Sequence, residues 1–394
     1  MTRSPALGLL ALLLLLPLFA RAAPEPAPAA AQPAPLPSPP ELAAKSWILI
    51  DAHTGQVLVE HNADERLPPA SLTKLMTSYL IAEEIAKGKF DERTLVPISV
   101  KAWRMGGSKM FVREGSQVAV GDLLQGIIVQ SGNDATVAMA EYIAGSEEAF
   151  AQLMNQHAER LGMTATHFEN ASGWPAEGHL TTARDLALLF RAMIRDYPEH
   201  YRLYAEKHFE YNGIRQPNRN LLLWRDPSVD GGKTGHTEAA GYCLVASALR
   251  DDMRLVSVVM GTASEQARAA ETQKLFGYGF RFFETAKLYQ AGEVLQADAR
   301  VWFGDRDRVN LVVPETVYLT LPRGTRDNLK ATLVVDEVIR APLTRTTAVG
   351  TLKVERDGNA LISVPIVPDQ EVARAGLFAR IWDHLVLFFK QLFS

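Results

Sequence analysis

The chain has 394 residues, 47% of them hydrophobic, so it can bury a sizeable core and is long enough for two domains. Its formal net charge is −4 and it has no basic tract, which argues against a nucleic-acid partner. A single cysteine, Cys243, excludes an intrachain disulfide, and its strand-like surroundings predict a buried, inert thiol. No cluster of cysteine and histidine has metal-ligand spacing, so we expect no metal.

Residues 1–22 have the pattern of a secretory signal peptide. Arg3 precedes an apolar run from Leu7 to Phe19, and Ala20-Arg21-Ala22 is a small-x-small cleavage pattern. A membrane-spanning helix is the alternative, but an apolar run of about 13 residues is too short to cross a bilayer. Residues 23–42, rich in alanine and proline, are expected to form an extended linker.

The next segments predict a hairpin at 46–62 and a helix that opens with Ser71, after two prolines, and ends near Gly88. Positions i and i+3 share one face of a helix, so the Lys74 amine can reach the Ser71 hydroxyl. A lysine can take the proton of a serine if burial or another cation keeps it partly neutral. This spacing favours acyl transfer, and the alternative is an N-cap serine followed by a solvated lysine.

Turn residues interrupt an apolar helical pattern at Ser131-Gly132-Asn133-Asp134. One interpretation is a helix C-cap at Gly132 followed by an N-cap at Asp134. The functional interpretation places Ser131 and Asn133 beside Ser71. The helical stretches predicted in this part of the chain are 123–129, 135–143, 146–161 and 182–195.

Residues 227–241 are rich in glycine and contain Lys233-Thr234-Gly235-His236-Thr237. Two strands, 242–249 and 254–261, and a helix from Ala267 to Leu288 are expected to follow. A lysine and a hydroxyl beside a glycine on an edge strand let substrate backbone lie close while the cation binds a carboxylate. The alternative is a solvated lysine that protects an edge strand from aggregation.

From residue 291 to residue 367 the sequence changes to short β-branched runs separated by turns. It contains no long helical pattern, which predicts a separate, smaller all-β domain. The runs are 301–303, 309–313, 317–321, 331–338, 352–355 and 361–366.

Residues 375–394 predict an amphipathic helix with a wide, aromatic apolar stripe that includes Phe378, Trp382 and Phe389. Arg380, Asp383, His384, Lys390 and Gln391 fall on the opposite side and interrupt the pattern too often for a spanning helix. We expect this helix to lie in a membrane interface. The alternative is a terminal helix that docks on the β domain through its apolar stripe.

Three short motifs occur once each, in a fixed order: Ser71-x-x-Lys74, Ser131-x-Asn133 and Lys233-Thr234-Gly235. The ordered set resembles the active-site set of the penicillin-interacting serine enzymes. The longer stretches 69–79, 130–135 and 232–242 are similar to low-molecular-mass penicillin-binding proteins of the D-alanyl-D-alanine carboxypeptidase type. The resemblance runs from about residue 47 to residue 284 and more loosely to the C-terminus.

This resemblance implies an α/β (α+β) transpeptidase-like and β-lactamase-like fold, with helices on both sides of an antiparallel sheet. The implied divisions are a catalytic domain at 43–288, a small all-β domain at 289–368 and a membrane-anchor helix at 369–394. Two departures affect the approach to the site: Gly231-Gly232 before Lys233, and the unusual loop Gly173-Trp174-Pro175.

The resemblance also implies roles for individual residues. Ser71 would be the nucleophile and Lys74 its base, and the backbone amides of Ser71 and His236 would form the oxyanion hole. Thr234 and Arg268 would hold the substrate's terminal carboxylate. The implied catalytic residues are Ser71, Lys74 and Ser131, and the implied substrate-binding residues are Asn133, Lys233, Thr234, Gly235, His236 and Arg268.

The implied protein is a periplasmic enzyme, peripherally attached to the inner membrane, that needs no cofactor and is acylated by β-lactams. It removes the terminal D-alanine from peptidoglycan pentapeptide stems. Two other enzymes remain open: a serine β-lactamase, although no Glu-x-x-Leu-Asn segment lies between Asn133 and Lys233, and a D,D-endopeptidase, which would usually lack the β domain. A catalytically idle peptidoglycan-binding scaffold is the alternative of another class.

Overall fold

The computed structural model describes residues 36–392. The predicted signal peptide, 1–22, and the first part of the predicted linker, 23–35, lie outside the described residues. Residues 36–42 have no regular secondary structure, and the Pro37 carbonyl accepts a hydrogen bond of 2.8 Å from the Tyr278 hydroxyl.

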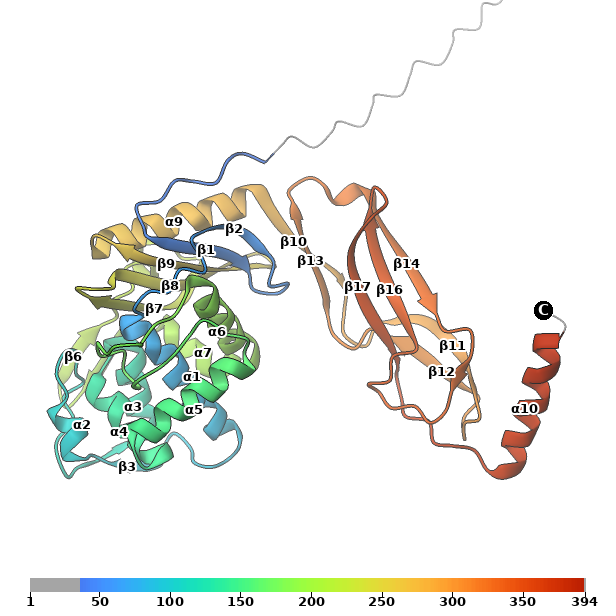
Figure 1. The fold of residues 1–394 in the computed structure, drawn as a ribbon, viewed down its shortest axis with the longest axis horizontal. Helices are drawn as coiled ribbons and strands as arrows, with labels where there is room; N and C mark the ends of the chain where they lie inside the picture. Colours follow the sequence, from blue (N-terminus) through green and yellow to red (C-terminus); the bar gives the residue numbers. More distant parts are fainter. Residues whose placement is uncertain (1–35, 393–394) are drawn as a thin grey trace, which may run out of the picture. The chain divides into compact units, whose positions relative to one another are not determined.

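A five-stranded antiparallel sheet, with strand order β2-β1-β9-β8-β7, lies at the centre of the first part of the described chain (Figure 1). Its strands are β1 (Ser46–Asp51), β2 (Val57–His61), β7 (Val229–Thr237), β8 (Gly241–Arg250) and β9 (Met253–Thr262). The predicted hairpin and the two predicted strands after residue 241 are confirmed. Strand β7, which carries Lys233, stands at one edge of the sheet, as expected.

Both faces of this sheet are buried, because alternate side chains of a strand point to opposite faces. In β1, Ile48 and Ile50 enter one apolar cluster, while Trp47 and Leu49 enter another. Helix α9 (Glu265–Phe282) packs on the second face, against β8 and β9. The other helices supply the first cluster, so the sheet is a middle layer between helices (Figure 1).

The helices on the first face begin at caps that the sequence indicates. The Ser146 and Thr182 hydroxyls each accept an N–H three residues later, at 3.1 Å, which satisfies an otherwise free donor. The predicted helices are confirmed, except that the second half of the predicted stretch 123–129 belongs to one turn of π-helix, Gly126–Gln130. The α-helices before the sheet's last three strands are α1 (Lys74–Ala86), α2 (Val100–Arg104), α3 (Val120–Gln125), α4 (Asn133–Ala144), α5 (Glu147–Arg160), α6 (Ala183–Asp196), α7 (Pro198–Tyr201) and α8 (Leu222–Arg225), with small hairpins β3 (Leu95–Pro97)–β4 (Gln117–Ala119) and β5 (His208–Tyr211)–β6 (Ile214–Pro217).

The helix predicted from Ala267 to Leu288 was wrong at its C-terminal end. Helix α9 ends at Phe282, and Phe283–Tyr289 form strand β10. The first residue of β10 continues the i, i+4, i+7 spacing of Phe276 and Phe280, so periodicity alone did not reveal the change. Pairing with a strand of the following region overrides the local pattern.

The predicted all-β region is confirmed. Residues 283–368 form a two-stranded sheet, β10-β13, and a six-stranded sheet, β14-β16-β17-β12-β11-β15, around a small core that includes Val301 and Leu311. The helical element within this range is one 3-10 turn, Arg326–Asn328. The strands after β10 are β11 (Val294–Trp302), β12 (Arg308–Val312), β13 (Val317–Pro322), β14 (Leu329–Val335), β15 (Ile339–Arg340), β16 (Gly350–Arg356) and β17 (Asn359–Pro368).

The predicted amphipathic helix is α10 (Leu377–Leu392), and it contacts the β region through the polar Asp383 and His384 and the apolar Val386 and Leu387. The Asp383 carboxylate accepts the Phe303 N–H at 2.6 Å, and Leu387 is buried in a cluster with Phe303. Most of the apolar stripe remains exposed, although Val386 packs against this cluster, so the described part of α10 does not dock through the stripe as a whole. The exposed apolar residues are Leu377, Phe378, Ile381, Trp382, Leu385, Phe388, Phe389 and Leu392.

Across residues 36–392, no helix combines the length and the apolar character needed to cross a membrane.

Candidate active site

Ser71 lies on a 3-10 turn, Ala70–Thr73, that runs directly into α1. Strand β7 passes close to this turn. A Cβ built on Gly235 would lie only 2.9 Å from the Pro69 carbonyl oxygen. Only glycine allows that approach without a shift of the backbone. The close approach brings the edge strand with Lys233 next to the serine, whereas the sequence predicted that this glycine would leave room for substrate backbone.

Lys74, at the start of α1, is completely buried and makes three hydrogen bonds. Its Nζ lies 2.9 Å from Ser71 Oγ, 2.7 Å from Asn133 Oδ1 and 2.6 Å from the Ser172 carbonyl oxygen. Burial, followed by the positive charge of Arg219, lowers the pKa of Lys74 to about 7. Burial is the main cause of this lowering, and Arg219 is the cation that contributes most.

Ser131 and Asn133 follow the π-helix in a tight turn. Ser131 has a left-handed backbone with φ of 64°, and Gly132 is the N-cap of α4. The Asn133 side chain is fixed at both ends, because its Nδ2 donates to the Gly106 carbonyl at 2.8 Å while its Oδ1 accepts from Lys74. The serine and asparagine therefore lie at the site, as the functional interpretation predicted.

Asp134, which one interpretation made a helix N-cap, has a different task. Its carboxylate accepts the backbone N–H groups of Met110, Phe111 and Val112 at 3.0, 2.9 and 3.3 Å. It thus fixes the loop after α2 against the start of α4, close to the Gly106 carbonyl that orients Asn133.

Lys233 joins the second and third motifs. Its Nζ donates to Ser131 Oγ at 2.9 Å and to the Thr234 carbonyl at 2.8 Å. Burial, followed by the charges of Lys74, Arg219 and Arg268, lowers the pKa of Lys233 well below its ordinary value. Several cationic groups thus share one buried region, which favours an anionic substrate group.

These residues open onto a cleft of about 230 Å³. Arg219 donates to Ser108 Oγ at 2.7 Å on one side, and the His236 and Tyr242 rings stack at 3.9 Å on another. Arg268 Nη1 lies 3.4 Å from the Gly235 carbonyl oxygen. The cleft is lined by Ser71, Ser108, Ser131, Arg219, Thr234, Gly235, His236, Tyr242, Glu265 and Arg268. The structure therefore brings all nine predicted site residues into the cleft or, for Lys74, Asn133 and Lys233, directly behind it.

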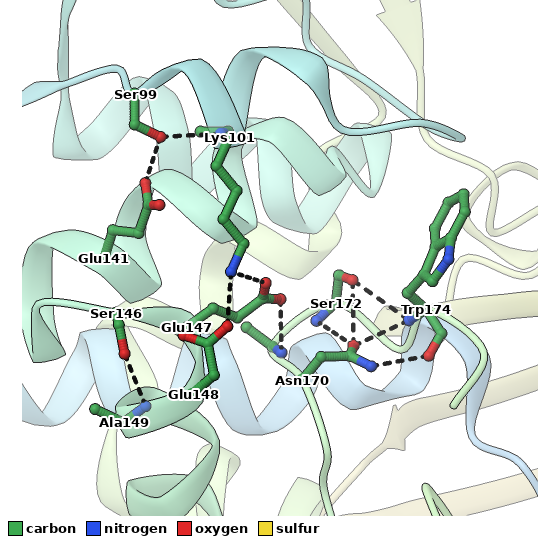
Figure 2. A network of polar contacts seen from close by, with 12 residues as sticks. Ser99, Lys101, Glu141, Ser146, Glu147, Glu148, Ala149, Asn170, Ser172 and Trp174 are labelled. Carbon is green, nitrogen blue, oxygen red and sulfur yellow. Dashed lines mark hydrogen bonds and ion pairs between the residues drawn. The ribbon is translucent and has the colours of Figure 1, made fainter. Parts of the chain in front are cut away.

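The loop that carries Ser172 is held tightly against the nucleophile turn. Gly173 has φ of +82°, and a Cβ built on it would lie 1.7 Å from the Ala70 carbonyl oxygen. The Asn170 side chain accepts the Trp174 N–H at 3.0 Å (Figure 2) and the Gly173 N–H at 2.9 Å. The unusual loop noted in the sequence thus holds the Ser172 carbonyl in hydrogen-bond contact with the Lys74 amine.

Sequence reasoning missed three contributors to the site: Arg219, Ser108 and the Ser172 carbonyl. Arg219 follows small hairpin β5–β6 and belongs to no motif, and Ser172 contributes only its backbone. A single arginine outside any motif does not indicate from the sequence that it contributes to an active site. The polar run Asn218-Arg219-Asn220, in which both asparagines are buried, was the only local hint.

Comparisons with known proteins agree with this geometry. The family model described as D-alanyl-D-alanine carboxypeptidase matches residues 33–264, and the model of the penicillin-binding protein 5 C-terminal domain matches residues 283–374. D-alanyl-D-alanine carboxypeptidase DacA from Escherichia coli K12 is 47% identical over 363 residues, which cover 90% of each chain.

Two solved structures extend the comparison. Penicillin-binding protein 5 from Haemophilus influenzae is 40% identical, with a TM-score of 0.78 over 86% of this chain and 99% of that chain. Penicillin-binding protein D2 from Listeria monocytogenes, in its ampicillin-bound form, is 30% identical, with a TM-score of 0.56 over 61% of this chain and 98% of that chain.

The transpeptidase-like fold, with a serine and a buried lysine in contact at a cleft, defines a serine hydrolase. The comparisons narrow this class of enzyme to one family. The chain belongs to the D-alanyl-D-alanine carboxypeptidases, which are low-molecular-mass penicillin-binding proteins.

Proposed function

We propose that the protein removes the terminal D-alanine from peptidoglycan pentapeptide stems through an acyl-enzyme on Ser71. One observation carries the proposal: the Lys74 amine lies 2.9 Å from the Ser71 hydroxyl and has a pKa of about 7. A base works best when its pKa is near the operating pH, because it is then both available and strong enough to take the proton.

In the first step the neutral Lys74 amine takes the Ser71 proton as Oγ attacks the carbonyl carbon of the penultimate D-alanine. The negative charge that develops on the carbonyl oxygen would be stabilised by the Ser71 and His236 amides, a contribution of roughly 3 to 4 kcal/mol to the barrier. The leaving amine needs a proton. Ser131, hydrogen-bonded to Lys233, is the group that we assign to pass it on.

The terminal carboxylate of the substrate would lie among the hydroxyl of Thr234 and the guanidinium groups of Arg268 and Arg219. All three residues line the cleft together with Ser71. A carboxylate among several donors and cations is strongly favoured in a partly buried site. This arrangement favours peptides with a free C-terminus over internal amide bonds.

A β-lactam would acylate Ser71 in the same way, because its strained amide presents a carbonyl to the same nucleophile. The similarity to the ampicillin-bound Listeria protein supports this part of the proposal. Water then hydrolyses the ester, releasing the shortened peptide or the opened drug.

Incubation with penicillin and with a peptide ending in D-Ala-D-Ala tests the proposal. The unsubstituted protein, called the parent below, should gain the mass of one penicillin and should release D-alanine. Ser71→Ala should do neither, and its cooperative unfolding should show that the fold is intact. An adduct that persisted in Ser71→Ala would place the nucleophile elsewhere. A folded parent without adduct or D-alanine release would favour the idle scaffold.

The two alternative enzymatic functions would give different results in the same assay. A β-lactamase would turn over penicillin rapidly without cutting the peptide, and a D,D-endopeptidase would cut cross-linked stems in preference to free C-termini. The match of residues 283–374 to a penicillin-binding protein C-terminal domain weighs against both.

We also propose a periplasmic location, with peripheral attachment to the inner membrane through α10. The exposed stripe supports this, because Phe378 and Trp382 are 87% and 67% exposed while the polar Asp383 faces the β region. Aromatic side chains on an amphipathic helix favour the membrane interface. We also propose a division into a catalytic domain and a β domain. Because β10 pairs with β13, we place the boundary at the end of α9 rather than at residue 288.

Sedimentation with lipid vesicles tests this attachment. The mature protein should co-sediment with vesicles and resist moderate salt, because apolar burial dominates over charge. Truncation after Val372 should release a soluble enzyme with unchanged activity on small peptides. Equal sedimentation of the truncated form, or no sedimentation of the full-length protein, would contradict the proposal.

A further inference from the structure

The short segment 170–173 faces α1 with two consecutive carbonyls. The Ala171 carbonyl accepts from Thr77 Oγ1 at 2.7 Å, and the Ser172 carbonyl accepts from Lys74 Nζ at 2.6 Å. The two donors lie one turn apart on one face of the helix. Any shift of the backbone at Ala171 and Ser172 therefore moves the Ser172 carbonyl, which holds the Lys74 amine.

Glu147 holds this segment from the other side. It is the first residue of α5, and its buried carboxylate accepts the Ala171 N–H at 3.2 Å and pairs with Lys101 Nζ at 3.0 Å (Figure 2). Lys101, on α2, also pairs with the exposed Glu148 at 3.0 Å. One carboxylate thus ties two helices to the backbone that touches Lys74.

The charge of Glu147 also acts on Lys74, although the two side chains are not in contact. The negative charges of Asp134 and Glu147 raise the pKa of Lys74, in opposition to burial and to Arg219. Asp134 is already engaged by backbone N–H groups. The charged or titratable groups that act electrostatically with Lys74 are Arg219, Lys233, His179, Asp134 and Glu147.

We propose that Glu147 is a positioning residue for acyl transfer: its carboxylate, anchored by Lys101, fixes the backbone at Ala171 so that the following Ser172 carbonyl holds the Lys74 amine at Ser71. The inference rests on the proposed function of Ser71 and Lys74. It assigns a role to a residue outside the three motifs and outside the cleft.

Three variants separate position from charge. Glu147→Ala removes both the acceptor and the charge, and we expect kcat for D-alanine release to fall about tenfold with KM little changed, because small misplacements of a reacting group are costly. Glu147→Gln keeps an acceptor oxygen, and kcat at its optimum should stay near that of the parent. Glu148→Gln, which removes the same charge from the neighbouring position, should behave like the parent.

The pH profile gives a readout that a merely structural residue would not move. Loss of the negative charge in Glu147→Gln makes the protonated lysine less favourable, so the acid limb of kcat/KM should move to lower pH. Lys101→Met leaves the carboxylate without its counter-ion, and the limb should move to higher pH. Opposite displacements in the two variants support the proposal.

Other outcomes overturn it. If Glu147→Ala matched Glu148→Gln in kcat, Glu147 would have no part in positioning Lys74. If Glu147→Gln and Lys101→Met both had the parent's acid limb, the Glu147 carboxylate would not act on the Lys74 amine, which also contradicts the proposal. Thermal unfolding of each variant identifies loss of folding, and Glu147→Gln and Lys101→Met carry the test if Glu147→Ala does not fold. Failure of the proposed function is distinct, because the parent itself would then release no D-alanine.

Discussion

The rate of acylation should depend on pH through Lys74, because this amine decides whether Ser71 can lose its proton. Its pKa is lowered to about 7 in the folded protein, and it acts in its neutral form, so the rate should rise with pH and level off above that value. A single group of this pKa is about 9% neutral at pH 6 and about 91% neutral at pH 8, a roughly tenfold increase in rate.

The second-order rate constant for a fluorescent penicillin, measured by stopped flow from acid to alkaline pH, tests this prediction. A lysine with an ordinary pKa would give a rise of about a hundredfold over the same two pH units and no plateau below about pH 10. Arg219→Gln removes a positive charge that lowers the pKa of Lys74, so the midpoint should move to higher pH, whereas Arg219→Lys should leave it nearly in place. A rate that still climbed beyond pH 9, or an unchanged midpoint in Arg219→Gln, would refute the reasoning.

Three further predictions concern stability. Gly173→Ala should cost at least about 2 kcal/mol more unfolding free energy than Gly145→Ala, because both have a left-handed backbone but only the first meets the Ala70 carbonyl; urea titration of both variants measures the difference, and equal losses would contradict the clash. Asp134→Asn should cost about 2 kcal/mol, because an amide cannot accept from as many backbone donors as the carboxylate does, and an unchanged urea midpoint would argue against that loop contact. Between about pH 7 and pH 10 the unfolded chain binds more protons than the folded one at Lys74, so the parent should gain up to about 4 kcal/mol of unfolding free energy relative to Lys74→Met, and parallel curves would show that the amine is not perturbed.

The elements that carry the site could be predicted because their signals are local. Helical spacing after Ser71, turn residues around Ser131 and the lysine-hydroxyl-glycine strand at Lys233 each reflect short-range chemistry, and their order in the chain added the specificity. Regular elements then brought them together at hydrogen-bond distance.

The parts that could not be predicted depend on packing between distant segments. Arg219 and the Ser172 carbonyl act on Lys74 from loops whose positions no local pattern encodes. The same holds for Asp383, which helical periodicity placed on the side opposite the apolar stripe and which accepts the backbone N–H of Phe303. Periodicity places a residue on a face of a helix and does not reveal what that face meets.

The three oxygen atoms around Lys74 determine the direction from which its nitrogen can receive a proton. A neutral amine has two N–H donors and one lone pair, and both Asn133 Oδ1 and the Ser172 carbonyl oxygen can only accept. These two oxygens take the two donors, so the lone pair is left for Ser71, which alone among the three has a hydrogen to give. Once the proton has moved, the ammonium has three donors for the same three oxygens, and neither helix α1 nor the loop at Ser172 has to reorganise.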